Sequence, residues 1–373
     1  MKKVMFITGF APSLINFRGD LIKTILAEGN DVIAVASDFD LKTETDLEAM
    51  NVKLIKVQSI NRSKSIFSNL RTFFLILKAM FDYKPDYIIP YTAKSVIYGS
   101  LSGKLLGIDS FPLITGIGIL HNRNNFLLAK ILEKMYSIAL SKSRLVFFQN
   151  NDDLKYFKEN ILNKRTQLKK INGSGVNIHK FPVLKNPKNI SFLMTSRLIK
   201  EKGVTYYIDA ARAIKKKYPK IIFYYAGGTN FSGVAVSNSD NKLENYLKLA
   251  IDDGVIENLG FVSDIKEAIK LASVFVLPSF YGEGLPRSSL ESMSCGRAII
   301  TTNSVGCRDT VLDSRNGIIV PIKDLNALET AMQFMIDYPE KTLEMGQESR
   351  KIIEEKFDVE KVNNEILNTI KNI

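Results

Sequence analysis

Short apolar runs alternate with amphipathic segments along most of this chain, and that alternation limits the folds open to it. Near the start, residues 4–8 form an apolar run, residues 9–17 form a loop that contains Gly9, and residues 19–28 have the pattern of a helix. A second apolar run follows at residues 31–37. Strand, glycine-containing loop, helix and strand in this order predict a doubly wound α/β domain built on a parallel sheet.

The length of the chain predicts a second domain. A chain of 373 residues is long for one hydrophobic core, and the same alternation resumes at residue 190. The small, polar stretch NGSGV is the closest thing to a linker, and two prolines, Pro182 and Pro187, follow it. We therefore expect a first domain over residues 1–172, a linker over residues 173–189 and a second domain over residues 190–356.

Composition narrows the class of protein. The chain is 45% hydrophobic and 24% charged, which is typical of a soluble globular protein. No apolar run approaches the ~20 residues of a membrane-spanning helix. Polar residues interrupt the apolar start, so a first strand is favoured over a signal peptide. Cys295 and Cys307 are the only cysteines and form no C-x-x-C pair, so neither disulfides nor a zinc site is expected and a cytoplasmic location is indicated.

The net charge of +12 is concentrated in the first half of the chain. Residues 1–170 hold 25 Lys and Arg against 15 Asp and Glu. A basic half suits nucleic acid, an anionic membrane or a pyrophosphate substrate. The sequence carries no nucleic-acid-binding motif, so nucleic acid is not expected as a partner and the anionic surface of the inner membrane is preferred.

Two segments of this half combine apolar and basic residues. As a helix, residues 66–83 are apolar all round, with Arg71 and Lys78 as internal basic charges. A buried or half-buried domain helix is favoured there, and a helix lying in the bilayer interface is the alternative. Residues 122–144 place basic side chains among apolar positions, with Glu133 alone opposing them, which suits either an anionic lipid surface or ordinary solvent exposure.

The second half contains a strand, a loop of small residues and a helix between residues 273 and 296. Pro286 suits the first helical position and Gly296 the position just past the last turn. A diphosphate could lie on the exposed N–H groups at the start of this helix. Glu283 before the helix and Glu291 inside it could then accept hydrogen bonds from sugar hydroxyls on either side. The alternative is a capped surface helix with solvated glutamates.

These residues carry a family resemblance. Glu283 and Glu291 form an E-x(7)-E pair inside P-S-x-x-x-E-G-L-P and E-S-M-S-C-G, which resembles the retaining family-4 glycosyltransferases. The resemblance covers nearly the whole chain and is most specific from Arg197 to Thr310. It implies the GT-B fold, an α/β architecture of two Rossmann-like domains facing a central cleft, with a C-terminal helix (residues 357–373) crossing back to the first domain.

The resemblance also implies which residues bind the donor. Arg197 and Lys202 are similar to the basic pair that holds the donor diphosphate, and residues 258–262 are similar to the segment whose backbone contacts the base. It assigns Glu291 to the ribose hydroxyls and Glu283 to hydroxyls of the transferred sugar. Glu283 is the first catalytic candidate, as a residue that positions this sugar. The expected donor-binding residues are Arg197, Lys202, Phe261, Val262, Glu283, Gly284, Leu285 and Glu291.

The acceptor side rests on fewer residues. The stretch TGIG, followed by His121, resembles the T-G-L-G segment of bacterial enzymes that extend lipid-linked oligosaccharides. His121 departs from the aromatic residue expected there. It is a second catalytic candidate, as a hydrogen-bond partner of an acceptor hydroxyl or donor phosphate, or it has no chemical role. Further expected acceptor residues, on predicted loops at the carboxyl edge of the first sheet, are Gly9, Asn16, Arg18, Thr115 and Gly116.

The sequence therefore predicts a retaining glycosyltransferase without cofactor or metal. The expected donor is a nucleotide-sugar, with UDP favoured over GDP, and the expected acceptor is a polyprenyl-diphosphate-linked saccharide in O-antigen, capsule or lipopolysaccharide assembly. Two alternatives are a non-hydrolysing sugar-nucleotide epimerase and a non-catalytic, membrane-docked scaffold. A nicotinamide oxidoreductase is disfavoured because the first strand–helix turn lacks G-x-G-x-x-G.

Overall fold

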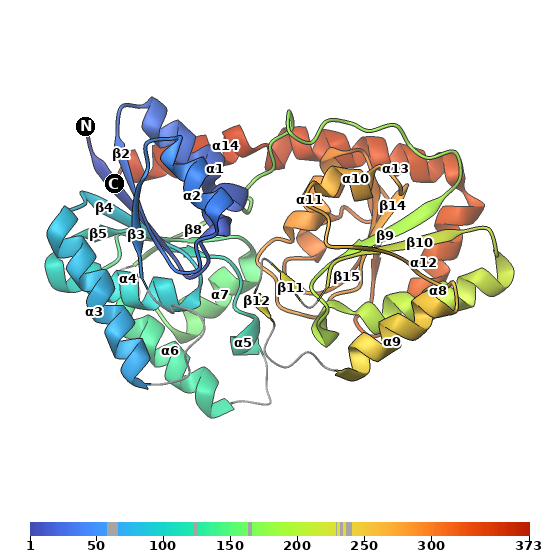
Figure 1. Cartoon of the computed structure of the whole chain (residues 1–373), viewed down its shortest axis with the longest axis horizontal. Helices are drawn as coiled ribbons and strands as arrows, with labels where there is room; N and C mark the ends of the chain where they lie inside the picture. Colours follow the sequence, from blue (N-terminus) through green and yellow to red (C-terminus); the bar gives the residue numbers. More distant parts are fainter. Residues whose placement is uncertain (58–65, 122–125, 163–165, 229, 232–233, 236–240) are drawn as a thin grey trace. The chain divides into compact units, whose positions relative to one another are not determined.

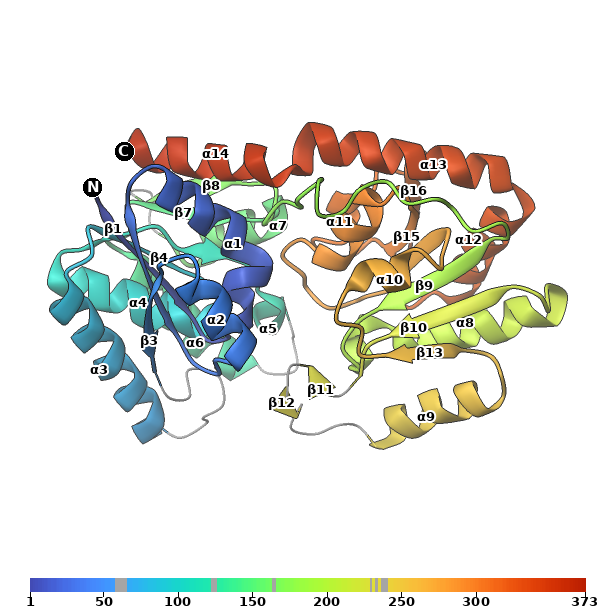
Figure 2. The same cartoon turned by 45° about the horizontal axis from the view of Figure 1, so that its top comes forward.

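The chain forms two compact units, which are described separately. The computed structural model describes residues 1–57, 66–121, 126–162, 166–228, 230–231, 234–235 and 241–373. Unit 1 comprises Met1–Gly175 together with Val359–Ile373, and unit 2 comprises Val176–Asp358. Figures 1 and 2 show each unit as strands covered by helices.

Unit 1 is built on parallel strands. A five-stranded sheet has the order β3-β2-β1-β4-β5, and a three-stranded sheet has the order β6-β7-β8. A bridge between Tyr91 and Leu113 connects the two sheets at the end of β4. The strands are β1 (Lys3–Thr8), β2 (Asp31–Ala36), β3 (Lys53–Lys56), β4 (Tyr87–Pro90), β5 (Asp109–Ser110), β6 (Leu113–Ile114), β7 (Leu145–Phe148) and β8 (Gln167–Lys170).

Helices cover both faces of these strands. Helices α1, α2 and α14 contribute to one core with Val4 and Phe6 of β1, whereas α3, α4, α6 and α7 contribute to the other with Met5 and Ile7. Alternate residues of one strand thus feed opposite cores, as expected for a buried parallel sheet. The helices are α1 (Pro12–Ala27), α2 (Leu41–Glu48), α3 (Ile66–Tyr83), α4 (Ala93–Leu106), α5 (Gly118–His121), α6 (Phe126–Leu140), α7 (Asn151–Asn160) and α14 (Val359–Lys371).

The start of α1 differs from the sequence prediction. Residues 9–17 were predicted as a loop, but α1 begins at Pro12, so this prediction is wrong. Proline is favoured in the first helical turn because its missing N–H has no partner there in any case. The buried Leu14 then continues the apolar face that Leu21 and Ile25 complete. The helix therefore starts about two turns earlier than residue 19, where the sequence pattern placed it.

Unit 2 contains one six-stranded parallel sheet. Its order is β13-β10-β9-β14-β15-β16, so the first strand in sequence lies in the middle and the chain winds outward in both directions. A short antiparallel pair is formed by β11 (Asn230–Phe231) and β12 (Val234–Ala235). The sheet strands are β9 (Ser191–Thr195), β10 (Ile222–Ala226), β13 (Glu257–Gly260), β14 (Val274–Leu277), β15 (Ala298–Thr302) and β16 (Gly317–Val320).

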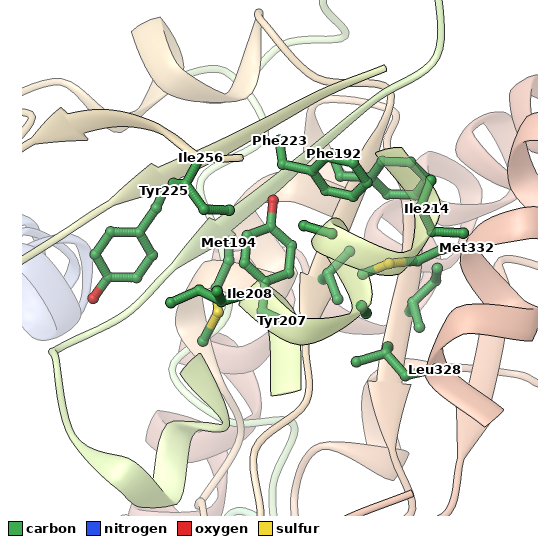
Figure 3. Packing of buried hydrophobic residues seen from close by; sticks show 14 of the residues in the cluster. Phe192, Met194, Tyr207, Ile208, Ile214, Phe223, Tyr225, Ile256, Leu328 and Met332 are labelled. Atoms are coloured by element: carbon green, nitrogen blue, oxygen red, sulfur yellow. The ribbon is translucent and has the colours of Figure 1, made fainter. Parts of the chain in front are cut away.

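Two apolar cores enclose this sheet. One contains Phe192 and Phe223, whose rings stack with centroids 5.0 Å apart against α8, α9 and α12 (Figure 3). The other contains Leu193 and Phe275 and packs against α10 and α11. The helical segments are η2 (Lys200–Lys202), α8 (Val204–Lys217), α9 (Asn241–Asp252), α10 (Ile265–Ile269), α11 (Arg287–Ser294), η3 (Arg308–Thr310), α12 (Leu325–Asp337), α13 (Pro339–Ile352) and the π-helix η4 (Ile353–Phe357).

The C-terminal helix returns to unit 1. Val362, Ile366 and Leu367 of α14 are buried in the core that contains α1. Lys169 Nζ at the end of β8 donates to Thr369 Oγ1 at 2.7 Å. The predicted doubly wound α/β fold and the return of the C-terminal helix are therefore confirmed. None of the helices within the described ranges is long and apolar enough to cross a membrane.

The first segment of unit 2, which leads to β9, is held in place by a buried arginine. Arg297 is 1% exposed, and its guanidinium donates to the carbonyls of Leu184, Lys185 and Ile269 at 3.1 to 3.2 Å and to Asn186 Oδ1 at 2.6 Å. Burial lowers the pKa of Arg297 to about 10, which still leaves it charged at neutral pH. The part of the expected linker that follows Val176 is therefore attached to unit 2.

We expect Arg297→Met to destabilise unit 2 by roughly 3 kcal/mol, because it leaves several buried acceptors without a donor. Arg315→Met is the matched control, since the Arg315 side chain is 61% exposed and forms an ion pair with Glu348 on the surface. Its cost should stay below about 1 kcal/mol. Urea unfolding of both variants checks this, and equal midpoints would contradict the role given to Arg297.

Candidate active site

The strand order of unit 2 defines where a ligand fits. The neighbouring strands β9 and β14 are parallel, and the helices that follow them pack into opposite cores, α8 into one and α11 into the other. Their connecting loops therefore diverge at the carboxyl ends of the strands. In open α/β sheets such a divergence leaves the crevice where ligands bind. Arg197 and Lys202 follow β9, and Glu283 follows β14.

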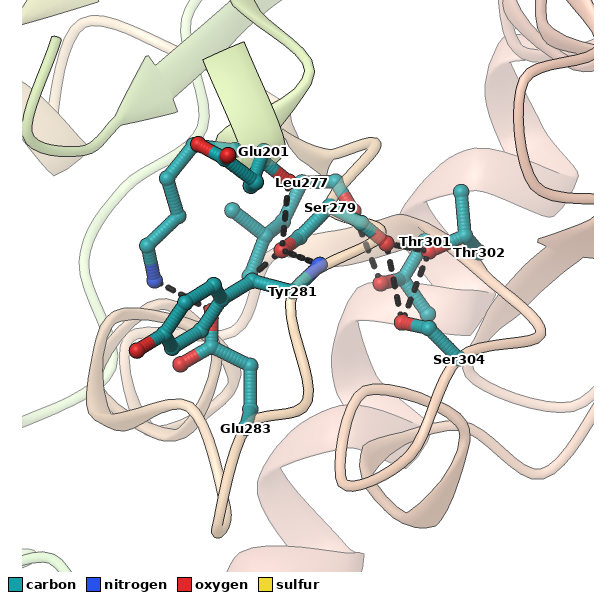
Figure 4. Close-up of polar contacts among 9 residues, drawn as sticks. Glu201, Leu277, Ser279, Tyr281, Glu283, Thr301, Thr302 and Ser304 are labelled. Atoms are coloured by element: carbon teal, nitrogen blue, oxygen red, sulfur yellow. Dashed lines mark hydrogen bonds and ion pairs between the residues drawn. The ribbon is translucent and has the colours of Figure 1, made fainter. Parts of the chain in front are cut away.

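The loop after β14 is held by hydroxyl groups. Ser279 Oγ donates to the Glu201 carbonyl at 3.2 Å and receives the Tyr281 N–H at 3.2 Å (Figure 4). The Ser279 carbonyl accepts from Thr302 Oγ1 and from Ser304 Oγ, the latter at 2.8 Å. These side chains come from β15 and its following turn, so the loop is fixed from three adjacent strands.

Two glycines allow the backbone to close around this loop. Gly306 has φ of +76°, and a Cβ there would lie 2.3 Å from the Gly284 carbonyl oxygen and 2.5 Å from that of Glu283. Gly203 has φ of +79°, and a Cβ there would lie 2.1 Å from the Pro278 carbonyl oxygen. Any side chain at these positions would push the loop outward. The position of Glu283 thus depends on backbone contact that only glycine permits.

Glu283 and Lys202 form an ion pair. Lys202 Nζ contacts Glu283 Oε1, and both side chains are about seven-eighths buried, at 13% and 14% exposed. Ser279 Oγ also lies 3.3 Å from this carboxylate oxygen, so its one hydrogen can go to Glu283 instead of to the Glu201 carbonyl. Tyr281 lies beside the pair, where burial raises the pKa of its hydroxyl and the charge of Arg197 partly opposes that rise. The structure therefore brings Lys202 and Glu283 into contact, and the charge of Arg197 acts on Tyr281 beside them.

Glu291 lies one helical turn from a basic residue. It is inside α11, and its Oε1 accepts from Arg287 Nε at 2.9 Å, with the two side chains 16% and 14% exposed. Burial raises the pKa of Glu291, whereas the charges of Arg287 and Lys180 act to lower it. The prediction that Pro286 is the first helical residue is wrong, because Pro286 is the N-cap with ψ of 113° and the helix starts at Arg287. Gly296 follows the helix with φ of +77°, as predicted.

Arg287 is the site residue that the sequence reasoning missed. A cation in the first turn of a helix is disfavoured by the helix dipole. Its place at the start of α11 is therefore offset by the contact with Glu291, and it adds positive charge where the helix amides already favour an anion. The i, i+4 spacing of Arg287 and Glu291 is the sequence signal that could have identified the pair.

The remaining predicted donor residues lie in the same unit. Gly284 is buried and Leu285 is half-buried against the core beneath α11. Phe261 and Val262 follow β13, where Phe261 is 63% exposed and Val262 packs on that core. They reach the carboxyl edge of the sheet two strands from β9, because β10 lies between β13 and β9.

Two of the predicted acceptor residues do not lie on a loop. Asn16 and Arg18 are inside α1, so their prediction as carboxyl-edge loop residues is wrong. Asn16 is exposed, whereas Arg18 is 2% exposed and its guanidinium lies 5.4 Å from the centre of the Tyr91 ring. Tyr91 Oη in turn pairs with Ser13 Oγ at 3.0 Å, and burial raises the pKa of Tyr91 to about 12. Arg18 is thus part of the interior of unit 1.

The other predicted acceptor residues follow strand ends in unit 1. Gly9 comes directly after β1, and its N–H donates to Thr92 Oγ1 at 3.4 Å. Thr115 and Gly116 follow β6 and are half-exposed, and Gly116 has φ of +120°. His121 ends α5, but its side chain lies outside the described part of the structure. No group of three metal-binding side chains occurs among the residues that the structure describes.

Both cysteines are structural residues. Cys295 ends α11 and Cys307 lies in the turn next to the Glu283 loop, and both are fully buried. Burial raises the pKa of each thiol to about 12, so both are neutral at physiological pH. Neither thiol is poised to act as a nucleophile.

Comparison with solved structures identifies the fold class. A crystal structure of Anabaena Alr3699/HepE in complex with UDP-glucose superposes with a TM-score of 0.80 over 100% of both chains, at 17% identity. The galactosyltransferase WaaB of the lipopolysaccharide outer core superposes with a TM-score of 0.68 over 100% of both chains, at 16% identity. The chain therefore has the GT-B fold, as predicted.

Sequence comparison identifies the family. Residues 176–352 match the family model described as Glycosyl transferases group 1. A Campylobacter jejuni N,N'-diacetylbacillosaminyl-diphospho-undecaprenol alpha-1,3-N-acetylgalactosaminyltransferase is 24% identical over 90% of this chain and 89% of its own length. An Escherichia coli UDP-Gal:alpha-D-GlcNAc-diphosphoundecaprenol alpha-1,3-galactosyltransferase is 23% identical over 79% of this chain and 77% of its own. The matched residues span nearly all of unit 2, so unit 2 carries the domain of this glycosyltransferase family.

We expect the effect of Arg287→Gln on stability to depend on pH. The pKa of Glu291 is raised above its ordinary 4.5 in the folded protein, so the folded state binds the proton more tightly than the unfolded state. The contribution of Glu291 to the free energy of unfolding is therefore largest below pH 4.5 and falls as the pH rises through the raised pKa. Without Arg287 the buried carboxylate loses its partner, so the pKa of Glu291 rises further. The loss of stability between acidic and alkaline pH then becomes larger. The variant should lose about 1–3 kcal/mol at pH 8 and much less at the most acidic pH at which the protein is folded.

Urea unfolding of the wild type and of Arg287→Gln at these two pH values measures the difference. Arg315→Gln provides a control for the loss of an exposed arginine. A loss that is equal at both pH values would show that the ion pair with Glu291 does not govern the stability of α11.

Proposed function

We propose that the protein transfers a hexose or N-acetylhexosamine from a UDP-sugar, with retention, to a saccharide carried on a polyprenyl diphosphate. The product would belong to the assembly of an O-antigen, capsule or other lipopolysaccharide-type surface glycan. The observation that carries this proposal is the convergence of Arg197, Lys202 and Glu283 at the switch point of unit 2, with Arg287 and Glu291 on the helix that follows. The names of the two relatives, both acting on undecaprenyl-diphosphate-linked saccharides, support the acceptor class.

The donor diphosphate would lie at the start of α11. The amides that follow Glu283, at Gly284 and Leu285 and in the first helical turn, supply hydrogen-bond donors and the positive end of the dipole. Arg197 provides a planar fork for two oxygens and Lys202 a compact charge. Negative charge grows on the diphosphate as the sugar leaves, so these fixed donors stabilise the transition state more than the ground state.

Both glutamates that we propose as sugar-binding residues already pair with a basic side chain, so a bound donor must compete with one pair and can use the other. Lys202 lies on Glu283, and Arg287 lies on Glu291. An arriving diphosphate would draw Lys202 toward its oxygens and leave Glu283 to accept hydrogen bonds from hydroxyls of the transferred sugar. Arg287 would keep Glu291 ionised and oriented as an acceptor for the ribose hydroxyls. Phe261 and Val262 would border the uracil.

The acceptor would bind in unit 1. Gly9, Asn16, Thr115 and Gly116 are the proposed contacts, with His121 as a hydrogen-bonding candidate. Arg18 is withdrawn from this set because it is buried under Tyr91. A polyprenyl chain keeps its sugar at a membrane, so we also propose that the protein associates peripherally with the anionic cytoplasmic face of the inner membrane.

We expect Glu291→Gln and Arg197→Ala to weaken UDP binding by tenfold to a hundredfold, as the loss of about 1.5–3 kcal/mol from a charge-assisted hydrogen bond requires. Isothermal titration with UDP and with 2′-deoxy-UDP measures this. The wild type should prefer UDP, and Glu291→Gln should lose that preference while Arg197→Ala keeps it.

Glu344→Gln and Arg212→Ala are the matched controls in unit 2, the first on the exposed side of α13 and the second on α8. Both should bind UDP as the wild type does. Unchanged UDP affinity in Glu291→Gln or in Arg197→Ala would remove that residue from the donor site.

A further inference from the structure

Helix α3 has an apolar stripe on its outer side. Its inner side is buried in unit 1 through Thr72, Ile76 and Met80. On the opposite side, large apolar side chains recur at the spacing of one helix face and point to solvent. They are Phe67, Leu70, Phe74 and Phe81, which are 85%, 50%, 60% and 65% exposed. The helix is therefore half-buried, which lies within the prediction of a buried or half-buried domain helix, and its outer side is apolar too.

Helix α6 carries a matching stripe. Tyr136 and Leu140 are buried, whereas Leu127, Ile131 and Ile138 are 73%, 50% and 45% exposed on the other side. Phe126 and Leu128 extend the stripe at the start of the helix. Residues spaced by four and seven share one face of a helix, so this stripe is continuous.

These two stripes belong to one layer of helices. Helix α4 packs against α3 on one side and against α6 on the other, and all three cover the same face of the strands (Figures 1 and 2). Lys104 Nζ of α4 donates to the Ile138 carbonyl of α6 at 3.1 Å, and the neighbouring Leu105 is 61% exposed. The exposed side chains of α3 and α6, together with Leu105 of α4, are here termed the α3–α6 face. Apolar groups of this number on one surface mark an interaction site.

Basic side chains are interleaved with this apolar surface. Arg71 and Lys78 lie on the exposed side of α3, and Lys130 and Lys134 lie on that of α6. The acidic residues of the same two helices are Asp82, which pairs with Lys78, and Glu133, which is buried against Lys130 and Tyr156. The α3–α6 face is thus apolar and positively charged.

The positive charge of the α3–α6 face favours an anionic partner over a second copy of this chain. A second copy of this chain on the same face would bring like charges together, which opposes a two-fold contact. An anionic bilayer accepts both features, because phenylalanine and leucine enter the acyl boundary while lysine and arginine reach the phosphates. We infer that the α3–α6 face docks on an anionic lipid bilayer, with α3 and α6 lying in its interface; this inference rests on the proposed function.

Vesicle co-sedimentation tests the inference with the full chain. The wild type should bind vesicles of phosphatidylcholine with phosphatidylglycerol, and should bind pure phosphatidylcholine vesicles less. Phe74→Ser/Phe81→Ser and Leu127→Ser/Ile131→Ser should each reduce the partition coefficient by about tenfold or more, as the burial of two large apolar side chains predicts. Lys130→Gln/Lys134→Gln should reduce binding to the anionic vesicles about fivefold for each lysine and leave binding to neutral vesicles unchanged.

Val183→Ser/Leu249→Ser is the matched control, because Val183 and Leu249 of unit 2 are 60% and 56% exposed outside the α3–α6 face. Each variant is first shown to keep the urea midpoint and the UDP affinity of the wild type, which confirms that it is folded. Equal vesicle binding by wild type and by the Phe74/Phe81 variant would overturn the inference. A wild-type dimer in vesicle-free solution that this variant converts to monomer would also overturn it, in favour of a second copy as occupant.

Activity measurements separate this inference from the proposed function. With a long-chain polyprenyl acceptor in vesicles, the Phe74/Phe81 variant should turn over at least tenfold more slowly than the wild type. With a short, water-soluble diphosphate acceptor, both should be equally active. Vesicle binding without transfer to either acceptor would contradict the proposed function alone. Transfer to both acceptors at wild-type rates by the variant would contradict docking alone.

Discussion

The pairing of β9 with β14 is the constraint on which the site depends. These strands meet at the point where the winding of the sheet reverses, so one is followed by a helix on one face and the other by a helix on the opposite face. The two loops cannot pack on each other over their full length, and their polar groups remain at the edge of the sheet. Glycine at residues 203 and 306 then permits backbone contacts that fix the loop of Glu283. The family match of unit 2 and the GT-B fold agree with this local geometry.

Charge compensation is the second theme of the site. A buried carboxylate without a partner is costly, and in unit 2 both glutamates of the E-x(7)-E pair contact a basic side chain. The pairs differ in construction. Lys202 reaches Glu283 from the loop after a different strand, so that pair can separate when a ligand competes for the ammonium. Arg287 and Glu291 share one helix, so that pair is held by local geometry.

The sequence predicted the fold well because two periodicities agree along the chain. Buried strands such as β9 and β14 are continuous apolar runs, and helices such as α8 repeat apolar residues at helical spacing. The start of α1 was missed because Gly9 and Pro12 were interpreted as loop residues, although proline at the first helical position favours a helix. That error also misplaced Asn16 and Arg18. No local pattern shows that Arg18 would be covered by Tyr91, since the contact spans 73 positions and depends on the strand order.

The candidate site was predictable only in part, because some of its contacts also depend on which strands are neighbours in the sheet. The motif around Glu283 identified the loop, and the basic pair after β9 was recognised by its spacing. The contacts between the two loops, and the role of Ser279 in joining them, follow from the adjacency of β9, β14 and β15, which no short stretch specifies. Exposure of the outer side of α3 was likewise undetermined, because a helix that is apolar all round gives no indication of which side faces the core.

A crystal structure of the protein with bound UDP tests the central claim most directly. The account predicts the diphosphate on the amides after Glu283, with Lys202 moved from that carboxylate to a phosphate oxygen and the ribose hydroxyls on Glu291. Electron density for UDP away from the loops of β9 and β14, or a bound diphosphate that leaves the ion pair between Lys202 and Glu283 intact, would contradict it.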